Sequence, residues 1–293
     1  MNVAVLGPIC KDRVIIDNQY SDQPGGVPYY TGSALESLGV DVTIFASCSN
    51  DDSYLLNLIN AKKINHIPTT DTINFINKYA DHNLDQRHQK AVYQSDLVRN
   101  NAVLSNNFSK FDYVVLGTLL QENLSEEFMK VLYSNNTKTF LTGQGLISTI
   151  NNKAEVIKKI PENIQPILSS LDYLLADKQE LLFLSNSDDL SSAVEILQDQ
   201  GVKNFLVTDG KQGSHLFINE EIFTILAYPP TKTVDPTGAG DSYLAGFIKA
   251  QELFSDTLQQ GQFAAMTATM AIEEKGPFNK STEEVLKRLE RVQ

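Results

Sequence analysis

The stretch "TVDPTGAGDSYLAGF" (residues 233–247) decides the fold, because small residues lead directly into an apolar segment with helical spacing. A helix is therefore predicted to begin near Gly240 or Asp241. A helix start presents unpaired backbone N–H groups and the positive end of the helix dipole. Gly238, Ala239 and Gly240 would let a phosphate approach this backbone closely.

Two interpretations of Asp241 remain open on this spacing. Asp241 would lie within reach of a phosphoryl group and of a substrate hydroxyl, and could accept the hydroxyl proton as a general base. It could equally cap the helix, with the glycines making only a turn. Asp235 precedes Pro236, so its backbone is expected to be extended, and it could orient the loop or line a cation site. The chain has no G-x-x-x-x-G-K-[ST] pattern and is therefore not a P-loop protein.

Outward from this loop, short apolar runs alternate with longer helical patterns. The alternation predicts βαβ units and an α/β fold with a mostly parallel sheet covered by helices on both faces. Strands are expected at 3–7, 41–47, 111–117, 137–142, 171–176 and 203–210. Helices are expected at 28–38, 125–134, 178–184 and 190–200, followed by three helices within 238–292.

Three segments interrupt this alternation. Residues 12–18 directly follow the first strand, and residues 72–80 and 86–94 look like two strands joined by the polar turn "DHNLD". Together they could form a small sheet over the carboxyl ends of the parallel strands, where ligands bind in open α/β folds. The alternative is a plain surface hairpin.

Composition narrows the functional classes. Of the 293 residues, 42% are hydrophobic and 20% are charged, which predicts a globular core. A net charge of −12 argues against non-specific binding to nucleic acid or to an anionic membrane. No apolar run has the length of a membrane span, and no signal-peptide pattern is seen. The two cysteines, Cys10 and Cys48, fit a reducing cytoplasm better than a disulfide framework.

The segment "DPTGAGDSYLAGF" (235–247) resembles the C-terminal signature of the ribokinase-like (PfkB) carbohydrate kinases, with Pro236 where threonine is usual. The resemblance implies one ribokinase-like α/β domain over residues 1–293, with a reduced β lid formed by about 12–24 and 72–94. It also implies ATP as the phosphoryl donor, Mg²⁺ as the metal and a cytoplasmic location.

In that family the second aspartate of the signature is the catalytic base. The resemblance therefore implies that Asp241 is the base and also contacts the substrate. The backbone amides of Gly238, Ala239, Gly240 and Asp241 would form the anion hole for the γ-phosphoryl oxygens.

Two N-terminal patterns agree with this resemblance. "GGVPYYTGSALESLG" (25–39) resembles the family's glycine-pair motif, which implies that Gly25 and Gly26 approach the substrate. Tyr30 replaces the asparagine that touches sugar hydroxyls in the family, although packing on a helix face would also explain it. "GPICKD" (7–12) implies that Asp12 accepts hydrogen bonds from substrate hydroxyls, the alternative being an exposed strand end.

The metal is implied by "ADKQE" (176–180), which resembles the family's Asn-x-x-Glu motif. Asp177 and Glu180 would organise Mg²⁺ and its waters near the phosphates. The alternative is an acidic first helical turn favoured by the helix dipole.

The nucleotide is implied by "VTDGKQG" (207–213), in which Thr208 and Gly210 would approach the phosphates and Gly213 would shape the loop. Residues 264–276 occupy the place of the family's helix and glycine beside the adenine.

A subgroup of the family that includes inositol-kinase-like members supplies two further similarities. Residues 73–91 resemble its Phe-x-Asn-x-Tyr…Arg-x-Gln pattern, which places Arg87 near the substrate or phosphates, unless it is a solvated lid residue. "GQGLI" (143–147) resembles its Gln-Gly-x-Leu strand end and implies a substrate contact for Gln144. Thr142 stands where an aspartate is common.

The expected function is an ATP-dependent, Mg²⁺-requiring kinase that phosphorylates a hydroxyl of a small sugar, polyol or cyclitol. A nucleoside kinase of the same family and a non-catalytic sugar or nucleotide sensor on a kinase scaffold are the alternatives. An NAD-dependent oxidoreductase is disfavoured because "GPICKD" lacks a G-x-G-x-x-G pattern. A monovalent cation such as K⁺ beside Asp235 and a homodimer are further options, whereas no nucleic-acid or membrane partner is expected.

Overall fold

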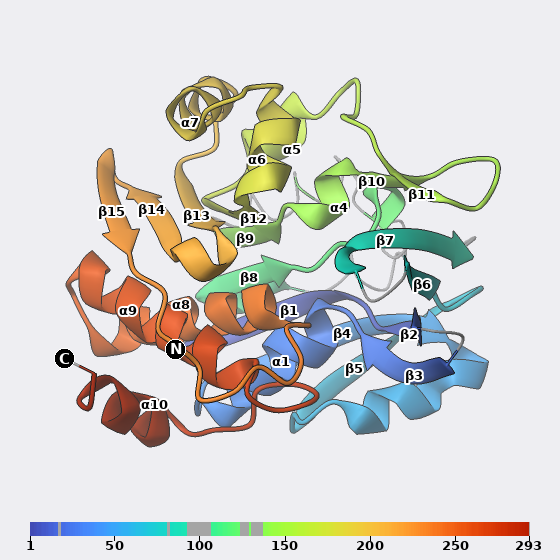
Figure 1. The fold of residues 1–293 in the computed structure, drawn as a ribbon, viewed down its shortest axis with the longest axis horizontal. Helices are drawn as coiled ribbons and strands as arrows, with labels where there is room; N and C mark the ends of the chain where they lie inside the picture. Colours follow the sequence, from blue (N-terminus) through green and yellow to red (C-terminus); the bar gives the residue numbers. More distant parts are fainter. Residues whose placement is uncertain (17–18, 81–82, 93–106, 124–128, 130–136, 293) are drawn as a thin grey trace.

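The structure is a computed structural model that describes residues 1–292, except 17–18, 81–82, 93–106, 124–128 and 130–136. A nine-stranded sheet forms the centre of this described chain (Figure 1). The last three strands along the chain pair antiparallel, and all other neighbours in the sheet pair in parallel. The mostly parallel sheet is therefore confirmed. Its order is β15 (Glu221–Ile225), β14 (Ser214–Ile218), β13 (Asn204–Thr208), β12 (Tyr173–Asp177), β9 (Lys138–Thr142), β8 (Tyr113–Leu116), β1 (Asn2–Pro8), β4 (Asp41–Ser49) and β5 (Lys63–Thr69).

Both faces of this sheet are covered by helices. Alternate residues of β1 enter different cores, with Val3 and Val5 on one face and Ala4 and Leu6 on the other. The first core includes α1 (Val27–Ser37), α8 (Ala239–Leu253), α9 (Thr257–Ala271) and α10 (Thr282–Leu289). The second includes α5 (Gln165–Leu168), α6 (Lys178–Ser185) and α7 (Leu190–Asp199). Strands buried on both faces explain the near-continuous apolar runs in the sequence.

A second, four-stranded sheet has the order β3 (Gln19–Gly25), β2 (Cys10–Ile16), β6 (Asn74–Ala80) and β7 (Asn83–Val92). Its strands occupy the segments that interrupted the helix–strand alternation. The Lys11 ammonium of β2 donates to both carboxylate oxygens of Asp52, at 3.0 and 2.8 Å. Asp52 belongs to the 3₁₀ helix η1 (Asn50–Leu58), so this ion pair joins the small sheet to the end of β4.

Several elements were not predicted. Strands β5, β14 and β15 lack the long apolar runs of the central strands, since each carries polar or charged side chains. Two short strands, β10 (Ser148–Ile150) and β11 (Val156–Lys158), form a further hairpin after α4 (Gln144–Ile147). Three 3₁₀ turns complete the described elements: η2 (Phe108–Lys110), η3 (Gln121–Asn123) and η4 (Gly210–Gln212). The helix expected at 125–134 falls almost entirely outside the described residues.

Candidate active site

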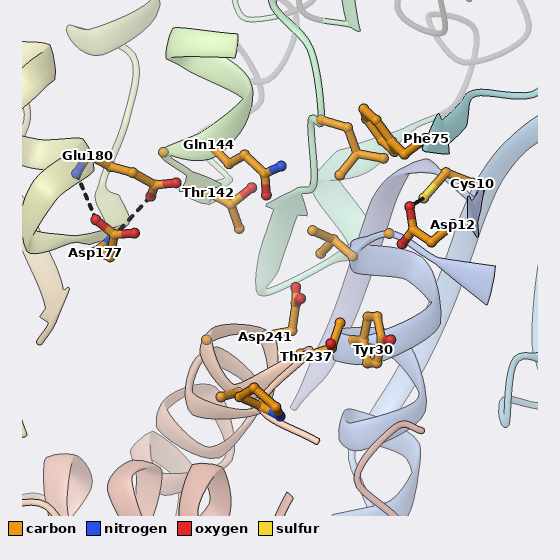
Figure 2. A pocket seen from close by; sticks show the side chains of 18 of the residues that line it. Cys10, Asp12, Tyr30, Phe75, Thr142, Gln144, Asp177, Glu180, Thr237 and Asp241 are labelled. Carbon is orange, nitrogen blue, oxygen red and sulfur yellow. Dashed lines mark hydrogen bonds between the residues drawn. The ribbon is translucent and has the colours of Figure 1, made fainter. Parts of the chain in front are cut away.

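A cavity of about 330 Å³ lies at the carboxyl ends of the parallel strands, where the small sheet meets the main sheet (Figure 2). Ligand sites in open α/β folds are expected at this edge. The volume falls at the lower end of the range for small-molecule pockets. The cavity therefore suits a small ligand or the reacting parts of two ligands.

The glycine loop and the start of α8 form one wall of this cavity. Gly238 caps the helix with φ 78°, in the left-handed region that glycine tolerates, and α8 begins at Ala239. Gly238, Ala239, Gly240 and Asp241 all line the cavity. Figure 2 shows the Asp241 carboxylate pointing into the cavity, so a carboxylate at the start of a helix faces the space for a ligand.

The surroundings of Asp241 alter its acidity. Burial raises the pKa of this carboxyl group to about 6, and a hydrogen bond from Thr31 opposes that rise. The Thr31 hydroxyl donates to Asp241 Oδ1 at 2.9 Å, and Thr31 is fully buried. A carboxyl group with this pKa is mostly ionised at neutral pH and can still accept a proton readily.

Tyr30 lies beside this loop and lines the cavity. Its side chain is only 4% exposed, and burial raises the pKa of its phenol. A Cβ at Gly238 would come within 2.3 Å of the Tyr30 ring, so only glycine fits against this aromatic face. Tyr30 therefore packs against the loop, as the packing interpretation expects, and its contact with a substrate stays a prediction.

The opposite side of the cavity carries Asp12 and Cys10 of β2 (Figure 2). The Cys10 thiol lies 3.8 Å from Asp12 Oδ1, and burial followed by the charge of Asp12 raises the pKa of this thiol. Gly26 lines the cavity and caps α1 with φ 100°. Gly25 is not among the residues that line it, and a Cβ at Gly25 would lie 2.3 Å from Asp12 Oδ2. Gly25 therefore leaves room for the Asp12 carboxylate, and its expected approach to a substrate stays a prediction.

The small sheet adds Phe75, Asn77, Gln89 and Gln23 to this side of the cavity. Gln89 Nε2 donates to Asn77 Oδ1 at 2.9 Å across the β6–β7 pair. Arg87 pairs with Tyr79 in the same ladder, but its side chain lies outside the described part of the chain. Its expected contact with substrate or phosphate stays a prediction.

Asp177 and Glu180 line the far side of the cavity, at the end of β12 and the start of α6 (Figure 2). They form a capping box: Glu180 N donates to Asp177 Oδ1 at 2.7 Å, and Asp177 N donates to Glu180 Oε2 at 3.2 Å. The helix-start interpretation of these residues is therefore confirmed, and it does not remove them from the cavity.

Asp177 and Glu180 are two carboxylates of the cavity that could take part in binding Mg²⁺. Within the described residues, no group of three or more His, Cys, Asp or Glu side chains could hold a metal ion. Mg²⁺ commonly uses one or two protein carboxylates and completes its shell with waters and substrate phosphates. A pair of cavity-lining carboxylates fits that mode and does not fit a cage made of protein ligands alone.

The remaining predicted residues divide into two groups. Thr208 and Gln144 line the cavity, whereas Gly210, Gly213 and Asp235 are not among the residues around it. Gly213 has φ 98° and packs against the Ile225 carbonyl, so its glycine requirement is structural. Asp235 Oδ1 accepts a hydrogen bond from the backbone N of Thr237 at 2.9 Å, which supports the role in orienting the loop.

The fold brings three threonines to this site that were not predicted as site residues. Thr31 lies 210 positions from Asp241. Thr118 and Thr142 follow β8 and end β9, and both line the cavity. Their hydroxyl oxygens are buried without a hydrogen-bond partner in the described chain. Their place at neighbouring strand ends was the available clue, because polar residues there face the ligand edge.

No helix in the described residues is both long and apolar enough to span a membrane.

Residues 3–284 match the family that is described as pfkB family carbohydrate kinase. A nucleoside kinase of Methanocaldococcus jannaschii is 31% identical over 152 residues, covering 50% of this chain and 44% of that relative. The chain spans less than half of the length of the first curated relatives it matches, at 44%, 28% and 34%.

Two solved structures share the fold over nearly their whole length. A pyrophosphate-dependent kinase of the ribokinase family, in a sulfate complex, has a TM-score of 0.85 and 19% identity, covering 97% of this chain and 99% of that chain. Arabidopsis thaliana ribokinase with ribose and ATP has a TM-score of 0.76 and 20% identity, covering 98% of each chain. At these identities the likeness concerns the fold alone.

Proposed function

The chain belongs to the pfkB family of carbohydrate kinases, and from this premise we propose that it phosphorylates a hydroxyl of a small sugar, polyol or cyclitol, with ATP as donor. The observation that carries the proposal is the Asp241 carboxylate, which points into the cavity from the first turn of α8. It stands beside the glycine loop, with Asp12 on one side and Asp177 and Glu180 on the other.

Asp241 would accept the proton of the acceptor hydroxyl, whose oxygen attacks the terminal phosphorus of the donor. The new P–O bond forms as the bond to the leaving ADP oxygen breaks. The amides of Gly238, Ala239, Gly240 and Asp241 would hold the charge on the transferring phosphoryl oxygens. Mg²⁺, held through water by Asp177 and Glu180, would supply charge neutralisation for the donor phosphates.

The charge of the cavity supports an unphosphorylated acceptor. Asp12, Asp177, Glu180 and Asp241 line it, and its described lining residues include no Lys, Arg or His. Among the described lining residues, a phosphate on the acceptor would meet these carboxylates and no cation. Asp12 and the Asn77–Gln89 pair instead offer oxygen acceptors and amide donors suited to hydroxyl groups.

The small sheet would act as a lid that excludes water and limits hydrolysis of the donor. In this proposal residues 1–293 work as one catalytic domain in the cytoplasm. A homodimer and a K⁺ ion near Asp235 remain compatible with it. A nucleoside acceptor is the nearest alternative, since nucleoside kinases are among the curated relatives.

Pyrophosphate is a second candidate donor, supported by the extent of the cavity. Its lining includes Thr208 and residues 236–241 but neither Gly210 and Gly213 nor residues 264–276, where the adenine was expected. A donor without a nucleoside would need only the phosphate side. A pyrophosphate-dependent kinase of the ribokinase family shares this fold, which supports pyrophosphate as a candidate.

The test is a screen of the full chain with ATP or pyrophosphate and Mg²⁺ against free sugars, polyols, inositols, nucleosides and a sugar phosphate. ³¹P NMR would identify both the product and the spent donor. We expect transfer from ATP to an unphosphorylated polyhydroxyl acceptor. Transfer only to nucleosides would favour the alternative kinase, and tight ligand binding without any turnover would favour a sensor.

A further inference from the structure

A single threonine connects the substrate-side helix α1 to the base at the start of α8. Thr31 is fully buried, and its hydroxyl oxygen lies 2.9 Å from Asp241 Oδ1 and 3.3 Å from the Asp241 carbonyl oxygen. A hydroxyl has one hydrogen to donate, and the shorter contact to the carboxylate is the stronger partner. Hydrogen bonds to a charged acceptor are also stronger than those to a neutral one.

We propose that Thr31 is a positioning residue that fixes the Asp241 carboxylate through Oδ1 and leaves Oδ2 to take the proton of the acceptor hydroxyl. This inference rests on the proposed role of Asp241 as the base. It adds a residue outside the glycine-loop signature, on the helix that begins at the glycine pair.

The packing of α1 against the loop strengthens this role. Tyr30, the neighbour of Thr31, has its ring against the Cα of Gly238, where no Cβ would fit. Gly26 and Val27, at the start of the same helix, line the cavity. The helix α1 therefore contacts the cavity, the glycine loop and Asp241. These contacts hold the three parts in a fixed position relative to one another.

Among the described groups around Asp241, the Thr31 hydroxyl is the one that favours the ionised carboxylate. Cys10 and Asp12 face the cavity from β2, and Tyr30 faces it from α1. Asp177 and Glu180 lie across the cavity at α6, and Asp235 precedes the loop. None of these groups is a cation. The hydrogen bond from Thr31 favours the charged carboxylate against the burial that disfavours it.

The test compares Thr31→Val, which keeps the shape and removes the hydroxyl, with Thr31→Ser, which keeps the hydroxyl. For wild type, the acidic limb of kcat/KM against pH reports the ionisation of the base in the free enzyme. In Thr31→Val we expect this limb to move up by about one pH unit. We also expect kcat on the plateau to fall by about tenfold, with a smaller change in KM, because the carboxylate loses its fixed orientation. Thr31→Ser should restore both values to near wild type.

Thr137→Val is the matched control, because Thr137 is also buried, does not line the cavity and donates its hydroxyl hydrogen to the Phe108 carbonyl at 3.3 Å. It should leave the pH profile unchanged. An unshifted acidic limb in folded Thr31→Val would overturn the proposal, as would equal losses in Thr31→Val and Thr31→Ser. Thr31→Ala removes the same hydroxyl without adding bulk and gives the same readout if the valine variant does not fold. A separate experiment tests whether Asp241 is the base. If the Asp241→Asn variant is as active as wild type, Asp241 is not the base.

Discussion

At the scale of single residues, burial of the ionised Asp241 carboxylate lowers the stability of the folded chain. Its carboxyl group has a pKa of about 6 in the folded chain, against an unfolded value of about 3.9. Between these two values the folded state binds more protons than the unfolded state, so folding stability falls as pH rises from about 4 to about 6. Above about pH 6 the full destabilisation persists.

The variant Asp241→Asn does not titrate and should escape this loss. We expect its free energy of unfolding to exceed that of wild type by about 2–3 kcal/mol near neutral pH and by little near pH about 4. Denaturant unfolding at the two pH values measures the difference. An equal difference between the two proteins at both pH values would refute the burial argument.

Thr142 provides a second residue-scale prediction, with Thr139 on the same strand as its control. Thr142 Oγ1 is buried without a partner in the described chain. Thr139 Oγ1, also buried, donates to the Ser170 carbonyl at 3.1 Å and accepts from the Asp172 N–H at 3.2 Å. Removing an unsatisfied hydroxyl relieves a desolvation penalty, whereas removing a satisfied one leaves its partners unpaired.

We therefore expect Thr142→Val to stabilise the ligand-free protein by up to about 1 kcal/mol and Thr139→Val to destabilise it by about 1–2 kcal/mol. Thr142→Val should also raise KM for the acceptor, because the ligand loses a hydroxyl to bond with. The measurement is chemical unfolding of both variants, followed by steady-state kinetics. Similar destabilisation by both substitutions would show that Thr142 is satisfied in the free protein.

At the scale of elements, two helices begin with the same capping box in different places. Asp177 and Glu180 start α6 at the cavity, and Ser281 and Glu284 start α10 with the same reciprocal bonds. Only the first pair lines the cavity. Comparing the two helices separates the capping role of Asp177 from its proposed role with Mg²⁺.

Asp177→Ala and Ser281→Ala should each lower the free energy of unfolding by about 1 kcal/mol, since each removes a helix cap. Asp177→Ala alone should raise the Mg²⁺ concentration needed for half-maximal activity, by about tenfold. A magnesium titration of activity in both variants checks this. An unchanged titration in Asp177→Ala would leave that residue with the capping role only.

Sequence patterns predicted elements well where one local requirement dominated. The central strands are buried on both faces and appear as apolar runs, and the start of α8 follows from small residues before a helical pattern. The outer strands β5, β14 and β15 were missed because their side chains mix polar and apolar types. Asp177 and Glu180 lie three residues apart, and this spacing is compatible both with a helix cap and with a metal site. The spacing alone therefore could not distinguish the two roles.

At the scale of the whole molecule, the cavity gathers residues that the chain holds far apart. The small sheet, which includes β2, supplies one side of the cavity. The ends of β8, β9 and β12 supply another part of its lining, and α8 supplies Asp241. Parallel strands bring such ends to one edge, which let the sequence predict the place of the site. The contacts of Thr31 with Asp241 and of Tyr30 with Gly238 depend on how α1 packs against α8, and no local pattern encodes that packing.

The proposed mechanism depends on Asp241 as the base of a phosphoryl transfer. The most direct measurement is the rate of product formation by Asp241→Asn with the acceptor and donor found in the screen, compared with wild type near neutral pH. If Asp241 is the base, kcat should fall by about 10²–10⁴-fold, the usual contribution of a general base, with the variant folded and still binding the acceptor. A variant that keeps wild-type kcat would show that Asp241 is not the base.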